Sequence, residues 1–237
     1  MSAKITIIPT SHIARESIRQ INEAIEREKP DCIAVELDAG RYQALQEGEA
    51  PLLESLRALG PVTFIFFFVL KGLQDSLGRA VGIMPGADMM EAVRLGRLRG
   101  INVAFIDRDI GETFLRIKAV PAREKMRLLL FALMAATGLG LKIARQPGDK
   151  KSFDLSKVPP ENLVEEALII LKRRFPWLHR ILIEERNAYM AQRIGKLSTR
   201  YNNVLVVVGA GHAKGIEEIL FGNQWSVPSA TFTVIAR

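Results

Sequence analysis

Short apolar runs alternate with helical patterns along most of the chain. The run Val204–Val208 is uninterrupted and β-branched, which is typical of a strand buried on both faces of a parallel sheet. Strands are predicted at 5–8, 32–35, 101–106, 204–208 and 231–235. Helices are predicted at 14–28, around 41–42 and 52–53, and at 85–99, 161–174, 177–198 and 213–220. This alternation predicts an α/β fold with a central, mostly parallel sheet flanked by helices.

The middle of the chain departs from this alternation. From 110 to 197 the pattern is helical and broken by prolines, and segment 146–157 is rich in Gly, Asp, Lys and Ser, as loops are. We therefore expect one domain over 1–237, with a large helical insertion at about 110–200 between the third and fourth strands.

Two segments are strongly apolar, Val62–Leu70 and Leu128–Ile143. The second holds about 15 largely apolar residues, fewer than the roughly 20 that a membrane-spanning helix needs. We expect buried or interfacial helices here. A homodimer surface or a membrane-facing surface formed by Phe64–Phe68 and Leu128–Leu141 is the alternative.

Charge and cysteine content limit the kinds of binding partner and the cellular compartment that we expect. The chain has 33 Lys and Arg against 26 Asp and Glu, a formal net charge of +7, and a pI near 9.7. No block of like charges stands out, so the basic residues are expected to solvate helix faces and not to bind nucleic acid. Cys32 is the only cysteine and the N-terminus lacks an export signature, so we expect a reducing, cytoplasmic compartment, with peripheral membrane association left open.

Ionisable residues follow the predicted strands. These residues are His12, Glu36 with Asp38, Asp107 with Arg108, and His212. Because ligands bind outside the carboxyl ends of parallel strands, we expect the side chains to share one crevice. Two imidazoles and a carboxylate are a common ligand set for a catalytic divalent metal ion.

Each of these residues also has a simpler explanation. Either histidine could be a hydrogen-bonded turn residue, and Asp38 could cap the following helix. Asp107 could pair with its neighbour in sequence, and Glu185 with Arg186 could be solvated helix charges. Gly209-x-Gly211 after a strand suggests a dinucleotide turn, but the third glycine and the later acidic residue of that fingerprint are out of place.

Six short stretches occur in the order found in a known family. They are Pro9–His12, Val35–Asp38 followed by Arg41-Tyr42, Pro85–Met89, Ile106–Asp109, Glu185–Ala191 and Gly209–His212. On these stretches the chain resembles TraB/PrgY proteins, which are related to the Tiki proteases and more distantly to the EreA/ChaN-like fold. The family hallmark, two Gly-x-x-His motifs with an acid and an arginine, falls by resemblance on His12, Glu36, Arg108 and His212.

The sequence departs from the family at Pro9, where glycine is usual, and proline changes the turn because it fixes φ and removes a donor. Many microbial members continue into membrane-spanning helices, and we expect that region to be absent from this domain. The Tiki branch is described as metal-dependent peptidases, whereas the pheromone-shutdown branch limits a peptide signal by cleavage or sequestration.

These features give two functional expectations. The first is a metal-dependent hydrolase of peptides, with Mn²⁺, Co²⁺ or Zn²⁺ as cofactor and a homodimeric assembly. The metal ligands would be His12, Glu36 and His212. Catalytic roles are expected for Glu36, Arg108, Glu185 and Arg186, and substrate contacts for Asp38, Arg41 and Asp107. The second is a non-catalytic protein that captures a peptide or small anionic ligand, in which the arginines bind and the histidines shape the pocket.

Overall fold

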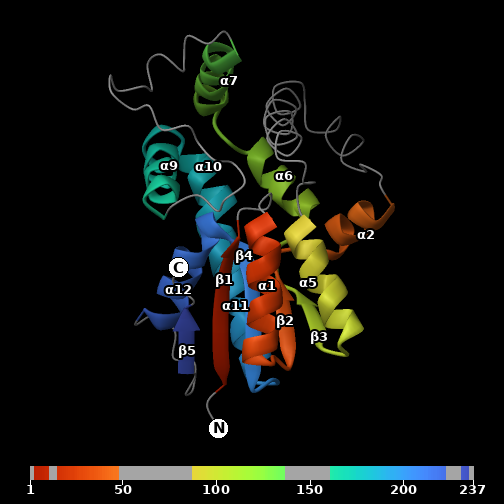
Figure 1. Cartoon of the computed structure of the whole chain (residues 1–237). Coiled ribbons are helices and arrows are strands. Elements are labelled where there is room, and N and C mark those ends of the chain that lie inside the picture. The colour runs from red at the N-terminus through yellow and green to blue at the C-terminus, as the bar shows by residue number, and fades with distance from the viewer. Residues whose placement is uncertain (1–2, 11–14, 48–86, 137–160, 223–230, 235–237) are drawn as a thin grey trace.

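The computed structural model describes residues 3–10, 15–47, 87–136, 161–222 and 231–234 (Figure 1). Within these ranges, five strands form one sheet in the order β3-β2-β4-β1-β5, and every pair of neighbouring strands is parallel. The strands are β1 (Lys4–Thr10), β2 (Cys32–Val35), β3 (Asn102–Phe105), β4 (Asn203–Gly209) and β5 (Thr231–Val234). The predicted α/β class with a parallel sheet is confirmed.

Helices connect the strands and surround the sheet. Those before β3 are α1 (Arg15–Glu28), α2 (Ala39–Glu47) and α5 (Ala87–Leu98). Those between β3 and β4 are α6 (Ile110–Lys118), α7 (Ala122–Ala136), α9 (Glu161–Arg174), α10 (Pro176–His179), the π-helix Arg180–Glu184, and α11 (Glu185–Ser198). Helix α12 (Ala210–Phe221) follows β4. The helical insertion therefore lies between the third and fourth strands, as predicted.

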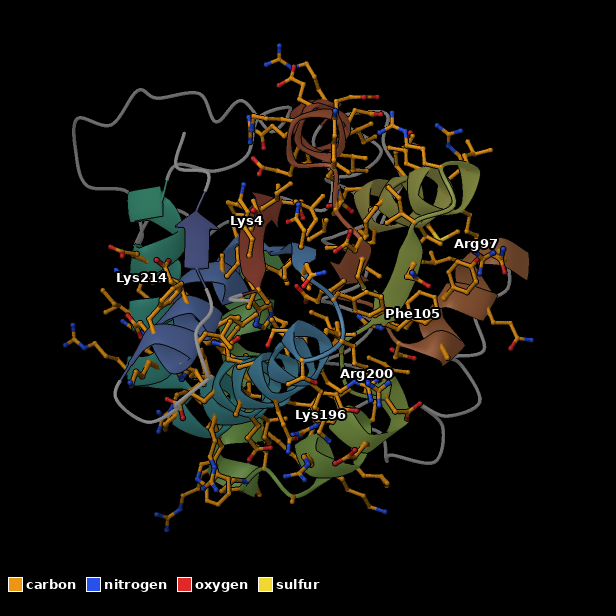
Figure 2. All side chains as sticks on the ribbon, turned by 90° about the horizontal axis from the view of Figure 1, so that it is seen from below. Lys4, Arg97, Phe105, Lys196, Arg200 and Lys214 are labelled. Atoms are coloured by element: carbon orange, nitrogen blue, oxygen red, sulfur yellow. The ribbon has the colours of Figure 1, made fainter. Side chains whose placement is uncertain are left out.

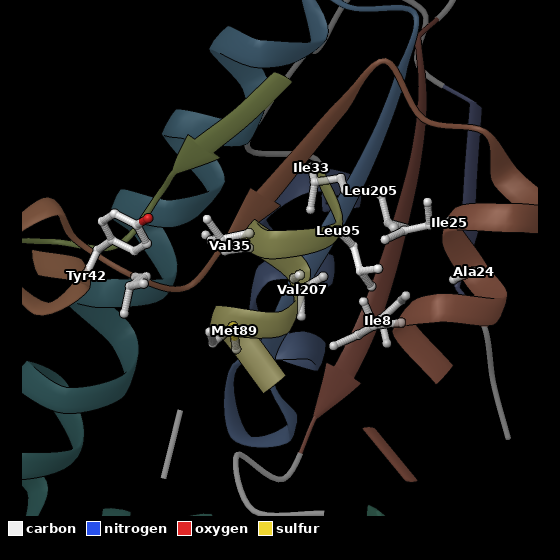
Figure 3. Close-up of a cluster of buried hydrophobic side chains, with 14 residues drawn as sticks. Ile8, Ala24, Ile25, Ile33, Val35, Tyr42, Met89, Leu95, Leu205 and Val207 are labelled. Carbon is white, nitrogen blue, oxygen red and sulfur yellow. The ribbon is translucent and has the colours of Figure 1, made fainter. Parts of the chain in front are cut away.

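Two apolar cores cover the two faces of the sheet. Alternate strand residues such as Ile33, Val35 and Val207 pack against α1 and α5 (Figure 3). Their neighbours in sequence, including Ala34 and Val206, point to the other face and pack against α11 and α12. Because both faces are covered, the strands are apolar throughout, which explains the uninterrupted β-branched run in β4.

The insertion has a core of its own. Phe114 of α6, Phe175 and Leu178 around α10, and Ile181 of the π-helix are buried together, and Leu128 of α7 packs against them. Figure 1 shows α6, α7, α9 and α10 at the top of the molecule, beyond the carboxyl ends of the strands. The insertion thus stands at the edge of the sheet where a ligand site was expected.

Two predicted elements differ in detail from those observed. The helix expected at 177–198 is interrupted by the π-helix, in which the Glu185 N–H donates to the Arg180 carbonyl five residues back. Helix α12 begins at Ala210 and not at 213, because Gly209 is extended and serves as its N-cap. His212 therefore lies in the first turn of a helix and not in a turn before one.

Several predictions fall outside the described residues. They concern His12, the short helix around 52–53, the segments Val62–Leu70 and Phe64–Phe68, and the loop at 146–157. Among the helices that are described, none combines the length and apolar character needed to cross a bilayer.

Cys32 offers a direct test of this packing. Its side chain is fully buried in β2, and burial raises the pKa of the thiol to about 11. Because the thiolate is the reactive form, we expect the native protein at pH 8 to resist labelling by iodoacetamide and the urea-unfolded chain to react fully. Mass spectrometry of the labelled chain measures this. Rapid stoichiometric labelling under native conditions would contradict the observed burial.

Candidate functional site

Three neighbouring strands deliver polar groups to the carboxyl edge of the sheet. Glu36 directly follows β2, and its N–H donates to the Val207 carbonyl at 3.0 Å. Its side-chain Oε2 accepts the Gly209 N–H at 2.6 Å, at the end of β4. Asp107 follows β3, and its N–H donates to the Leu37 carbonyl at 3.3 Å. Backbone hydrogen bonds to the strands therefore hold Glu36 and Asp107 in place independently of their side-chain contacts.

Arg186, from the first turn of α11, lies between these carboxylates. Nε donates to Asp107 Oδ1 at 3.0 Å, and Nη2 donates to Asp107 Oδ2 at 2.7 Å and also to Glu36 Oε1. Nη1 donates to the Leu182 carbonyl at 3.3 Å and lies 3.0 Å from His212 Nε2. All five N–H groups of the guanidinium are thereby used.

These contacts fix the tautomer of His212. A guanidinium only donates, so Nε2 of His212 accepts from Arg186 and carries no proton. On the other side of the ring, Nδ1 lies 2.6 Å from Asn187 Oδ1, to which it donates its hydrogen. The imidazole is therefore neutral, and its bare nitrogen points into the cluster formed by Glu36, Asp107, Arg186 and His212, which we call the central cluster.

Asn187 reaches His212 because α12 carries a glycine one turn further on. A Cβ at Gly215 would collide with the Asn187 side-chain amide. The glycine thus allows α11 and α12 to approach closely enough for Asn187 to orient the imidazole. Asn187 and His212 are both buried, at 5% and 6% exposure, so this hydrogen bond is shielded from water.

Opposite charges in the central cluster stabilise one another's ionised forms. Burial alone would raise the pKa of Asp107, but its hydrogen bond to Arg186 and the nearby charges of Arg186 and Arg41 outweigh burial and hold that pKa below its ordinary value. Burial disfavours the charged form of Arg186, yet Glu36 and Asp107 overcome this effect and raise its pKa. Both partners therefore stay ionised at neutral pH.

Arg41 and Asp38 extend the cluster toward α2. Asp38 Oδ1 accepts the Arg41 N–H at 3.0 Å and so caps this helix, and its Oδ2 accepts from Arg41 Nε at 2.5 Å. Arg41 also donates to Asp107 Oδ2 through Nη2. Asp38 thus acts as the helix cap that the sequence offered as an alternative, and it also aims Arg41 at the central cluster.

A second group of charges lies beside the first, and we call Arg108, Glu112, Arg116 and Glu185 the outer cluster. Glu185 Oε2 accepts from Arg108 Nη1 at 3.2 Å and from Arg116 Nη1 at 2.9 Å. Arg180 Nε lies 3.3 Å from Glu185 Oε1. The Arg108 guanidinium also lies over the Tyr189 ring, 5.7 Å from its centroid. Three arginines therefore converge on one carboxylate.

The two clusters are joined by crossed pairs. Asp107 and Arg108 are adjacent in sequence after β3, and Glu185 and Arg186 are adjacent at the start of α11. Asp107 pairs with Arg186, whereas Arg108 pairs with Glu185. The side chains of Asp107 and Arg108 consequently do not form the local pair that the sequence left open, and Glu185 and Arg186 are not simple solvated charges.

Two of the three expected metal ligands, Glu36 and His212, lie in the described residues. His212 Nε2 and Glu36 Oε1 are 3.4 Å apart, a separation that two ligands of one ion can have when each bond is about 2.0–2.2 Å. Within the described ranges no group of three or more His, Cys, Asp or Glu side chains is placed to hold an ion. His12 lies outside the described ranges. It follows β1 by two positions in sequence, and the last residue of that strand, Thr10, is paired in register with Gly209. The two described donors fit a shared ion by chemistry and spacing.

The two clusters differ in the sign of their net charge. The central cluster together with Asp38 and Arg41 contains three carboxylates and two guanidiniums, which leaves one negative charge with His212 neutral. The outer cluster with Arg180 contains three guanidiniums and two carboxylates, which leaves one positive charge. The central cluster therefore favours a further cation, and the outer cluster favours an anion.

The structure gathers most of the side chains that the sequence singled out. Glu36, Asp107, Arg186 and His212 meet in one cluster, with Asp38 and Arg41 beside it, while Arg108 and Glu185 pair in the other. Asn187, Gly215, Arg116 and Arg180 had no role assigned from sequence. Gly215 and His212 are three residues apart and therefore share one face of a helix. This spacing is the sequence signal that could have indicated a close contact at His212, such as the one that Asn187 of α11 makes.

The pH dependence of stability tests the ionised state of Asp107. Its pKa is held below the ordinary 3.8, so the stabilisation is fully present above that value and is lost as pH falls through the lower folded-state pKa. Asp107→Asn should lower the free energy of unfolding at pH 7 by about 3–5 kcal/mol, because a buried pair is broken. The decline of stability below about pH 4 should also become shallower. Urea unfolding at stepped pH measures both, with exposed Glu26→Gln as control; an unchanged slope would refute the assignment.

Two glycines of α12 provide a matched test of the Asn187–His212 contact. Gly215→Ala should cost about 1–3 kcal/mol of stability through overpacking and should shift the His212 ring resonances in NMR spectra, because Asn187 is displaced. Gly211→Ala places its Cβ 4.0 Å from the Leu168 side chain, so it should fit and leave those resonances in place. Equal effects of the two substitutions would contradict the close approach at Gly215.

Comparison with known proteins identifies relatives over nearly the whole chain. The family model described as TraB/PrgY/gumN matches residues 2–221. An uncharacterized protein of Methanocaldococcus jannaschii is 31% identical over 220 residues, which cover 91% of this chain and 53% of that protein. TraB domain-containing proteins of Bos taurus and Homo sapiens are each 24% identical over 245 residues, which cover 91% of this chain and 62% of theirs. This chain therefore spans between about half and three fifths of the length of these relatives, and it belongs to the TraB/PrgY/gumN family.

Proposed function

We propose that this domain is a metal-dependent hydrolase of peptides, with its reaction centre at the central cluster. The observation that carries the proposal is the bare Nε2 of His212, held 3.4 Å from Glu36 Oε1 in a buried group of side chains with one excess negative charge. A neutral imidazole and a carboxylate are the donors that bind a catalytic divalent ion. His212 and Glu36 would hold the ion, with His12 as the expected third ligand.

A divalent ion bound there would polarise a carbonyl oxygen and lower the pKa of its bound water. Asn187 would hold the imidazole in the tautomer that leaves Nε2 available. Arg186 makes two hydrogen bonds to Asp107 that involve neither Glu36 nor His212, so it would stay anchored when those two residues bind another cation. Its guanidinium would then lie beside the reacting carbonyl, where developing negative charge needs donors.

The outer cluster would hold the anionic part of the substrate. Its excess positive charge lies on Arg108, Arg116 and Arg180, and the last two are 44% and 62% exposed in their side chains. A peptide carboxylate could be bound by such guanidiniums through paired hydrogen bonds. This arrangement would place the end of a peptide at the outer cluster and an amide bond toward the central one.

The same outer cluster supports a second candidate, a protein that captures an anionic peptide without cleaving it. In that case the exposed guanidiniums bind the ligand and His212 only orders the crevice. His212→Ala distinguishes the candidates: turnover of a peptide library with added Mn²⁺, Co²⁺ or Zn²⁺ should vanish in a hydrolase, whereas peptide affinity should persist in a binder. Loss of neither property would contradict both roles for this histidine.

Cobalt binding tests the ligands without relying on turnover. Titration of the protein with Co²⁺ should produce visible absorption bands, because imidazole and carboxylate ligation in a low-symmetry site makes these bands intense. Glu36→Gln and His212→Ala should each weaken the Co²⁺ affinity by at least about 100-fold. This is the largest loss usually caused by changing a residue that only hydrogen-bonds to a metal ligand, so a ligand itself should lose at least as much. Glu26→Gln, an exposed carboxylate at the surface, should bind as the unmodified protein does. Wild-type protein that binds no Co²⁺, Mn²⁺ or Zn²⁺ would rule out the proposed ion.

A further inference from the structure

Exposed apolar side chains are concentrated on the helical insertion. Nine large apolar side chains are exposed in the described part of the chain, and six of them lie on α6, α7, α9 and α10. These six are Leu115, Met126, Leu130, Ile169, Ile170 and Trp177, with exposures of 45–65%. The concentration is meaningful because these helices already bury a core of their own, so the exposed residues are not needed to complete it.

Basic residues accompany these apolar side chains at helical spacing. On α7, the exposed residues Arg123, Met126, Arg127 and Leu130 are separated by three or four positions and therefore share one face. The basic–apolar surface is defined by the six apolar side chains and by the Lys and Arg residues three or four positions from them on the same helices. This interleaving is typical of helices that lie in a membrane interface, where long basic side chains reach the headgroups.

The remaining helices repeat this arrangement. Ile169 and Ile170 of α9 are followed four positions later by Arg173 and Arg174. On α6, Leu115 precedes Lys118 by three positions. The stretch 167–180 contains four basic residues and no acidic residue. Among the described residues, no carboxylate lies within ion-pair distance of Arg123 or Arg173, so their charges are available to an outside partner.

Contacts between the helices hold the basic–apolar surface together. Glu124 of α7 accepts the Leu178 N–H of α10 at 3.0 Å, and Arg127 donates to the Arg174 carbonyl at 2.8 Å. Figure 1 shows α9 and α10 side by side, with α7 above them, at the end of the molecule where the strands finish. The helices are thus braced against one another before any partner is present, which lowers the entropic cost of binding.

Charge decides between the two partners that an apolar surface of this kind could have. In a twofold dimer the same surface meets itself, so two positively charged surfaces would be brought together and would repel. An anionic bilayer offers negative headgroups to the basic residues and acyl chains to the apolar ones. We propose that the helical insertion binds anionic lipid through the basic–apolar surface and thereby attaches the protein peripherally to a membrane.

Trp177 provides the reporter for a direct test. The chain has two tryptophans, so Trp225→Phe leaves Trp177 as the single indole. With the full chain carrying this substitution, vesicles of phosphatidylcholine and phosphatidylglycerol in equal parts should shift the Trp177 emission to the blue and bring the protein down on sedimentation. Pure phosphatidylcholine vesicles should do neither, and added salt should release the protein.

Matched variants locate the contact. Arg123→Gln with Arg173→Gln should weaken vesicle binding about 25-fold, since each basic side chain at an anionic surface contributes about fivefold. Lys196→Gln with Arg200→Gln makes the same change in net charge at the opposite end of the sheet, the end seen in Figure 2, and should leave binding unchanged. Ile169→Ser with Ile170→Ser should weaken it at least about tenfold, whereas exposed Leu98→Ser on α5 should not.

The remaining outcomes overturn the proposal. No binding to anionic vesicles would exclude lipid as the partner. Equal losses from the two double substitutions of basic residues would show that net charge, and not the basic–apolar surface, is responsible. A concentration-dependent dimer in lipid-free sedimentation that is abolished by Ile169→Ser with Ile170→Ser would assign the surface to a second copy of the chain. None of these results depends on whether the central cluster is catalytic.

Discussion

The Arg186 guanidinium is the contact on which the rest of the site depends. It is mostly buried among Glu36, Asp107 and His212, and its five N–H groups are all used. A buried charge is tolerated only when such partners compensate for lost hydration, and even then an apolar core of equal volume is often as stable. The cluster is therefore poorly explained by stability alone, and its presence at the carboxyl edge of a parallel sheet favours a functional cause.

The contacts of Arg186 and its neighbour Glu185 also connect the start of α11 to the end of β3. The π-helix ends at Glu184, immediately before the two residues of α11 that point to the two clusters. Its extra residue changes the helical register at the point where Glu185 and Arg186 must face different partners. Such local departures from α-helical geometry are frequent at functional sites. The crossed pairing with Asp107 and Arg108 then fixes α11 against the end of β3.

The strands and the identity of the edge residues were predictable because they depend on local patterns. The apolar run 32–35 coincides with β2, and Glu36 follows it as expected. The partners of these residues were not predictable, because they depend on contacts across more than seventy positions, such as those of Asp107 and Arg186. Asn187 carries no chemical signature in a helix, and its hydrogen bond to His212 depends on the close approach of two helices that Gly215 allows. The start of α12 was placed too late because glycines at 209 and 211 suggest a turn.

The central claim is that Arg186 and Asn187 together hold His212 neutral, with the bare Nε2 directed at Glu36. This claim can be measured by long-range ¹H–¹⁵N correlation spectra of protein labelled on its three histidines, with His212 assigned from the His212→Ala spectrum. At pH 7 the spectra should show a protonated Nδ1 and an unprotonated Nε2 for His212, and Arg186→Gln should perturb the Nε2 signal. A protonated Nε2 in the unmodified protein, in either the opposite tautomer or the imidazolium form, would contradict the claim.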